Sequence, residues 1–131
     1  MNAPHYLRLL KTYSNNLEQI HTMLNSWNII DKYNEFIHLK LTQEEYETGR
    51  IEFKKRATTS LNTLIQFSSE IRYCHNEIQF YKSMVYELVD TNSLQTIIKE
   101  QEEYECLFKL VERQIKSLMY HIEQIRFDVL V

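Results

Sequence analysis

The sequence predicts an all-α protein, an elongated antiparallel three-helix bundle with coiled-coil-like packing. Apolar residues recur at alternating steps of three and four along most of the chain, as they do on a helix face that packs against other helices. One Gly and one Pro in 131 residues leave little material for tight turns, so the connections must be few and the helices long. A chain of this length is expected to form a single domain, residues 1–131.

The most regular segment is the predicted third helix, residues 93–129. Its apolar line, or seam, comprises Leu94, Ile97, Gln101, Tyr104, Phe108, Val111, Ile115, Leu118, Ile122, Ile125 and Val129. A helix with such a seam needs partner helices to cover it. Gln101 is the one polar interruption. A single buried amide fixes register or oligomeric state, whereas an amide at an exposed end does neither, and the sequence leaves both readings open.

The predicted first helix covers residues 4–40, and Pro4 suits its first turn. Its seam slips by one residue after Trp27. The slip indicates either a kink in one bent helix or a break at residues 25–28, with Asn28 capping a new helix. We favour one bent helix, and a break would make the bundle four helices. The seam comprises Tyr6, Leu10, Tyr13, Leu17, Ile20, Leu24 and Trp27, then Ile30, Tyr33 and Ile37.

The predicted second helix covers residues 43–89. Thr42 and Glu45 have the spacing of a capping box at its start. Gly49 and residues 58–60 are weak helix formers, and a break at either would also produce four helices. The polar residues 90–93 end this helix, and Asn92 or Ser93 is expected to cap the third. The second seam comprises Tyr46, Phe53, Ala57, Ser60, Leu64, Phe67, Ile71, Cys74, Ile78, Tyr81, Val85 and Leu88.

The unequal helix lengths predict that each end of the rod is two helices thick. With equal rise, the first helix reaches back only to about residue 79, and the third helix only to about residue 53. Residues 80–103 would then expose an apolar arc, which typically marks a binding site for another protein or a second copy. The alternative is that the chain covers this tip itself. The predicted interface residues are Phe80, Tyr81, Met84, Leu88, Leu94, Ile97 and Ile98.

A basic cluster near the other end predicts a second candidate surface. Arg50, Lys54, Lys55 and Arg56 lie close in sequence to aromatic residues, a combination that binds phosphate backbones or acidic partners. The alternative is a solvated helix face balanced by nearby glutamates. The net charge of −3 argues against general nucleic-acid binding.

Metal and catalytic chemistry have little support in the sequence. Two Glu-x-x-His pairs, Glu18/His21 and Glu35/His38, have the spacing used in di-iron bundles, but the glutamates fall on outward positions. His75 and His121 flank the seams as partly buried histidines. Cys74 lies in a seam and Cys106 on an outer line, without an adjacent His and acid. We therefore expect no catalytic residue, no metal and no cofactor.

The remaining expectations concern location and function. No run of about 18 apolar residues is present, so we expect no membrane contact, and two cysteines on different helices favour a reducing, cytoplasmic location. The favoured function is a non-enzymatic interaction protein, a scaffold, adaptor, chaperone or inhibitor-type subunit. Its partner would be another protein or a second copy in a homodimer. The alternatives are a nucleic-acid-binding subunit and, third, a metal-binding bundle.

Overall fold

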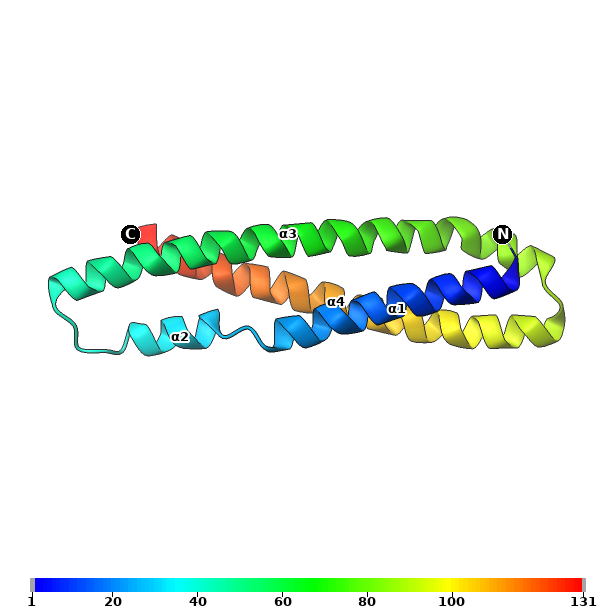
Figure 1. Cartoon of the computed structure of the whole chain (residues 1–131), viewed down its shortest axis with the longest axis horizontal. Helices are drawn as coiled ribbons and strands as arrows, with labels where there is room; N and C mark the ends of the chain where they lie inside the picture. The colour runs from blue at the N-terminus through cyan, green and yellow to red at the C-terminus, as the bar shows by residue number, and fades with distance from the viewer. Residues whose placement is uncertain (1, 131) are drawn as a thin grey trace.

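The computed structural model describes residues 2–130, and the side chains of residues 2–127. Four helices follow one another: α1 (Ala3–Asn25), α2 (Ile29–Phe36), α3 (Gln43–Leu88) and α4 (Thr91–Leu130). No strand occurs within residues 2–130. Figure 1 shows α1 and α2 following one another along the rod, with α3 returning beside them and α4 running back again. The predicted all-α antiparallel bundle is therefore confirmed.

The core follows the predicted seams closely in α4. Its buried apolar side chains are Ile97, Tyr104, Phe108, Val111, Ile115, Ile122 and Ile125, and Leu118 is half-buried against them. Gln101 is also buried. Val129 lies outside the side chains that the structure describes. Steps of three and four therefore identify nearly every residue by which α4 packs on its neighbours.

The favoured bent first helix is wrong, because the chain breaks between α1 and α2. Residues 26–28 leave the helix, with the Ser26 hydroxyl donating to the Met23 carbonyl at 2.6 Å. Asn28 directly precedes α2 at the N-cap position, but its side chain makes no capping hydrogen bond. The buried positions jump from Leu24 to Ile29, a step of five residues that one helix cannot place on one face. The break lets both helices face the core, and Ile37 is exposed instead of buried.

The start of α3 is as predicted, and the helix does not split. The Thr42 hydroxyl accepts from the Glu45 amide and the Glu45 carboxylate from the Thr42 amide, each at 3.2 Å. Gly49 lies within the helix without breaking it. The Phe36 ring occupies the space that a Cβ would need, which accounts for a glycine at this position.

At the start of α4 the predicted caps are wrong. Asp90 takes this role, since its Oδ1 accepts from the Ser93 amide at 2.7 Å.

The hairpin between α3 and α4 is covered further than predicted. Asn2 and Ala3 lie beside Val85, Leu88 and Val89, so α1 reaches almost to the end of α3 rather than to residue 79. The equal-rise estimate failed because residues 26–28 and 37–42 are not helical. The estimate gave these residues the 1.5 Å rise of a helix, although they do not continue one. Val85 and Ile97 are consequently buried by the chain itself.

The opposite end is thinner, as predicted. Figure 1 shows the first turns of α3 extending past the ends of both α2 and α4, beside the connection between α2 and α3. Four aromatic rings fill this end. Phe36 stacks on Tyr46 at a centroid distance of 5.6 Å and lies 5.1 Å from Phe53, which also meets Tyr33 at 5.3 Å. This aromatic cluster attaches the short α2 to α3.

Candidate functional site

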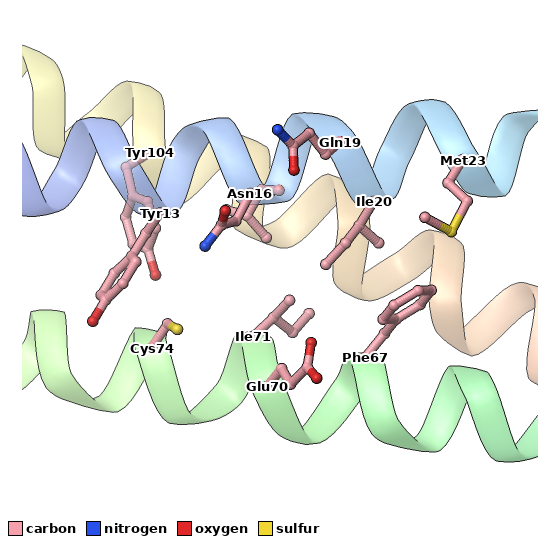
Figure 2. Close-up of a pocket in the computed structure, with 11 residues that line it drawn as sticks. Tyr13, Asn16, Gln19, Ile20, Met23, Phe67, Glu70, Ile71, Cys74 and Tyr104 are labelled. Atoms are coloured by element: carbon pink, nitrogen blue, oxygen red, sulfur yellow. The ribbon is translucent and has the colours of Figure 1, made fainter.

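A groove of about 290 Å³ lies between α1 and α3 in the middle of the rod. Figure 2 shows side chains of the two helices facing one another across it, with Tyr104 of α4 behind them. We call it the α1–α3 groove. Its lining consists of Tyr13, Asn16, Leu17, Gln19, Ile20, Met23, Phe67, Glu70, Ile71, Cys74 and Tyr104.

The groove exists because α1 packs more extensively on α4 than on α3. Two of the side chains that line it are small or polar. Asn16 lies on the α1 side and Cys74 on the α3 side, where a large apolar residue would otherwise fill the space. The thiol of Cys74 is half-buried, so it is not the fully enclosed core residue that its place in the seam predicted.

The groove has an apolar floor and an accessible apolar rim. Leu17, Ile20 and Ile71 are buried at its base. Phe67 is half-buried, and Met23 is 47% exposed at the α1 edge. A flexible methionine beside a fixed apolar floor is typical of surfaces that receive another protein's side chains.

The polar groups of the groove are held by hydrogen bonds across its walls. The Tyr13 hydroxyl donates to Oε2 of Glu77 at 2.7 Å, joining α1 to α3. Burial and this hydrogen bond raise the pKa of Tyr13. Burial, with Glu77 nearby, also raises the pKa of the Cys74 thiol. A raised thiol pKa leaves little thiolate at neutral pH, so Cys74 is a poor nucleophile.

A buried hydrogen-bond network lies next to the groove, toward the hairpin. The Tyr6 hydroxyl donates to Oε1 of Gln101, and Gln101 Nε2 donates to Oε1 of Glu105 at 3.0 Å. Glu105 also accepts from Lys82 Nζ at 3.3 Å. Gln101 is only 2% exposed, which excludes the reading that placed it at an exposed end. Its proposed part in setting register stays a prediction.

The residues predicted for the hairpin-tip interface lie in different environments. Phe80 and Leu88 are 66% and 75% exposed, and Met84 is also exposed. Tyr81, Leu94 and Ile98 are half-buried, while Ile97 is completely buried and unable to meet a partner. The tip as predicted is therefore reduced to the exposed flank of α3. Whether that flank binds anything stays a prediction.

The four basic residues do not share one surface. Lys54, Lys55 and Arg56 are consecutive in a helix, so their side chains leave it about 100° apart. Arg50 pairs with Glu47 at 3.2 Å and lies 5.8 Å from the Tyr46 ring. Arg56 lies over the Phe53 ring at 5.3 Å. The two arginines thus pack against the aromatic cluster, while Lys54 and Lys55 are exposed.

Four histidine side chains have partners within the chain, and one of them, the exposed His121, lies 2.7 Å from the Ser117 carbonyl. His21 Nδ1 lies 2.9 Å from Gln114 Oε1, and His38 Nδ1 lies 2.6 Å from the Asn34 carbonyl. His75 stacks on Phe108 and lies 3.2 Å from the Tyr104 hydroxyl. Among the residues that the structure describes, no three His, Cys, Asp or Glu side chains come close enough to hold a metal ion.

Comparison of the chain with protein-family models, with curated proteins and with solved structures gave no match. Within the described residues, no helix has both the length and the apolar character needed to cross a membrane. The site must therefore be interpreted from its own geometry. Sequence reasoning missed the groove, although Asn16 beside one seam and Cys74 within another were a usable signal.

Proposed function

We propose that this chain is a non-enzymatic interaction protein that binds a helix of a partner protein in the α1–α3 groove. The observation that carries the proposal is the groove between α1 and α3, which has an apolar floor and a partly exposed apolar rim. From Tyr13 to Met23 the α1 wall spans eleven residues, and the ten steps between them cover about 15 Å. That is the length of three helical turns.

The size of the groove favours a helix lying across its opening. A volume of about 290 Å³ accommodates a few side chains but not a helix backbone. A partner helix would therefore rest on α1 and α3 and insert side chains spaced at i, i+3 or i+4, and i+7. In this arrangement the partner becomes the fourth helix at the middle of the bundle.

Exposed apolar residues extend the same flank of α3. Glu70, Glu77 and Met84 are seven residues apart and so lie on one line of the helix. Glu77 contacts Tyr13 of α1, which places this line on the groove side. Tyr73 and Phe80, both largely exposed, lie beside it. The partner surface that we propose therefore shifts from the hairpin tip to the groove and this flank.

Two further points concern the location of the protein and nucleic-acid binding. Cys74 and Cys106 are both free thiols, which supports a reducing, cytoplasmic location. Nucleic-acid binding has less support than helix binding, because Arg50 and Arg56 pack on aromatic rings and the basic residues diverge around α3. A phosphate backbone would need several of these charges on one side.

The test is co-purification of tagged protein from its native source, with two matched variants. Met23→Glu puts a charge at the groove rim, and Leu110→Glu does the same on α4, away from the groove lining. The two side chains are 47% and 48% exposed, so both variants are expected to fold. We expect the wild type and Leu110→Glu to retain a stoichiometric protein partner that Met23→Glu loses. Equal retention by both variants would contradict the proposal.

A further inference from the structure

The charge at the α1–α3 groove has one sign. Glu70 lines the groove and Glu77 bounds it next to Tyr13, both on α3. The α1 wall contributes uncharged side chains, among them Asn16, Gln19 and Met23. None of the residues that line the groove is Lys or Arg. An occupant therefore meets an apolar floor with negative charge along one side.

The two carboxylates have a spacing that a helix can match. Glu70 and Glu77 are two turns apart, about 10.5 Å along α3. Glu70 is exposed, and its hydrogen bond from Gln66 Nε2 is long at 3.4 Å. Glu77 is half-buried and accepts the Tyr13 hydroxyl through one of its two oxygens. Both carboxylates retain acceptor capacity for a cation.

A second copy of this chain fits the groove poorly. Pairing the face with itself brings glutamates of one copy toward glutamates of the other without a cation from the groove lining between them. Like charges brought together at an interface oppose association. Charge complementarity instead favours a different protein that carries cations.

We propose that the occupant is a cationic amphipathic helix of another protein. Its apolar stripe is about three turns long, and Arg or Lys residues seven positions apart flank that stripe and pair with Glu70 and Glu77. Arg suits this role because its guanidinium binds a carboxylate with two parallel hydrogen bonds. This inference rests on the proposed function and specifies the chemistry of its partner.

The experiment uses three synthetic 18-residue peptides that share one leucine stripe on a helical background. Two flanking positions, seven residues apart, are both Arg, both Gln or both Glu. Binding to the full chain is measured by fluorescence anisotropy. We expect the Arg peptide to bind about tenfold more tightly than the Gln peptide, as two rim ion pairs would provide. The Glu peptide should bind most weakly, and added salt should reduce the differences.

Variants of the chain assign the effect to the groove. In the Glu70→Gln/Glu77→Gln double variant, which preserves the acceptor for Tyr13, the three peptides should bind within about twofold of one another. Glu70→Arg should weaken the Arg peptide and strengthen the Glu peptide. Thermal unfolding followed by circular dichroism checks that each variant folds.

The outcomes separate the inference from the proposed function. If all three peptides bind the wild type equally and Met23→Glu abolishes that binding, helix docking stands and the cationic partner is overturned. If no peptide binds, or if Leu110→Glu weakens binding as much as Met23→Glu, docking in the groove is overturned together with the inference.

Discussion

The Tyr6 hydroxyl donates a hydrogen bond to the Gln101 amide oxygen, joining the first helix to the fourth inside the core. Tyr6 is completely buried and Gln101 nearly so. The other end of the Gln101 amide reaches Glu105, which Lys82 also contacts. Sliding α1 along α4 by one turn would separate the two groups and leave the Tyr6 hydroxyl and the Gln101 amide oxygen buried without this hydrogen bond. We therefore expect the pair to favour one register among those that apolar seams alone would allow.

Replacing either member of this pair should be costly, and replacing both should cost less than the sum. Gln101→Leu and Tyr6→Phe should each lower the free energy of unfolding by about 1–3 kcal/mol, because each leaves a buried polar group unpaired. Urea unfolding of the two single variants and the double variant measures the coupling. Strictly additive losses would show that the hydrogen bond does not link the two helices.

The effect of replacing Gly49 on the free energy of unfolding should change sign when the Phe36 ring is removed. Gly49→Ala should destabilise the wild type, because the new Cβ would overlap the Phe36 ring and disturb its contacts with Tyr46 and Phe53. In a Phe36→Ala background the same change should stabilise by up to about 1 kcal/mol, the helix propensity gained from Gly to Ala. Urea unfolding measures both steps. A gain of the same size in both backgrounds would disprove the steric role of Gly49.

The stability should fall on acidification in two ranges. Burial lowers the pKa of His75 below the value of 6.5 expected in the unfolded chain, against the opposing effects of Glu105 and Glu112. Below about pH 6.5 the unfolded chain therefore binds more protons at this residue, and stability is lost as pH falls toward the folded pKa. His75→Gln should remove this part of the pH dependence in urea unfolding measured from pH 8 to 5.

A second loss should follow at lower pH through Glu105. Burial tends to raise the pKa of Glu105, but hydrogen bonds from Gln101, Lys82 and Gln79 outweigh it, so the pKa is lowered below 4.5. The stability from this carboxylate is present above pH 4.5 and is lost as pH falls through the folded pKa. Glu105→Gln should flatten the profile in this range. Because the Glu105 charge also raises the pKa of His75, its removal should make the loss of stability in the His75 range larger, not smaller. A single shared transition would contradict the separation of the two groups.

The chain should be a monomer in the absence of its partner. The exposed residues left at the hairpin end, chiefly Phe80 and Leu88, form a small patch, whereas stable dimers bury about 1,200–2,000 Å² in total. Sedimentation velocity at micromolar concentration should give one species of 16.0 kDa. A dimer that Phe80→Glu dissociates would instead support the homodimer expected from the sequence at the hairpin tip.

Periodicity predicted the fold well because burial in a bundle repeats with the helix turn. Ile97, Tyr104 and Val111 are buried where steps of three and four place them. The break at residues 26–28 was harder to predict, since Ser26 and Asn28 are acceptable both inside a kinked helix and outside it. Because residues 26–28 leave the helix, the start of α1 lies at the hairpin end and covers part of the predicted tip.

The α1–α3 groove depends on the distance between two helices, which the apolar seam of a single helix does not specify. Whether Met23 and Phe67 enclose a groove is set by the spacing between α1 and α3, and that spacing follows from how α1 packs on α4. The charge of Glu70 acquires a role only once the groove lies beside it. Sequence reasoning identified the helix faces, while the site required the packing of three helices at once.

The most direct measurement of groove docking uses the methionine methyl groups. Met23 lies in the groove, Met84 on the exposed flank of α3 near the hairpin, and Met119 half-buried on α4. With ¹³C-methyl-labelled methionine, addition of the Arg-flanked peptide should shift the Met23 resonance strongly and leave the Met119 resonance in place. A shift of Met84 with Met23 unchanged, or no shift of any methyl at saturating peptide, would contradict docking in the α1–α3 groove.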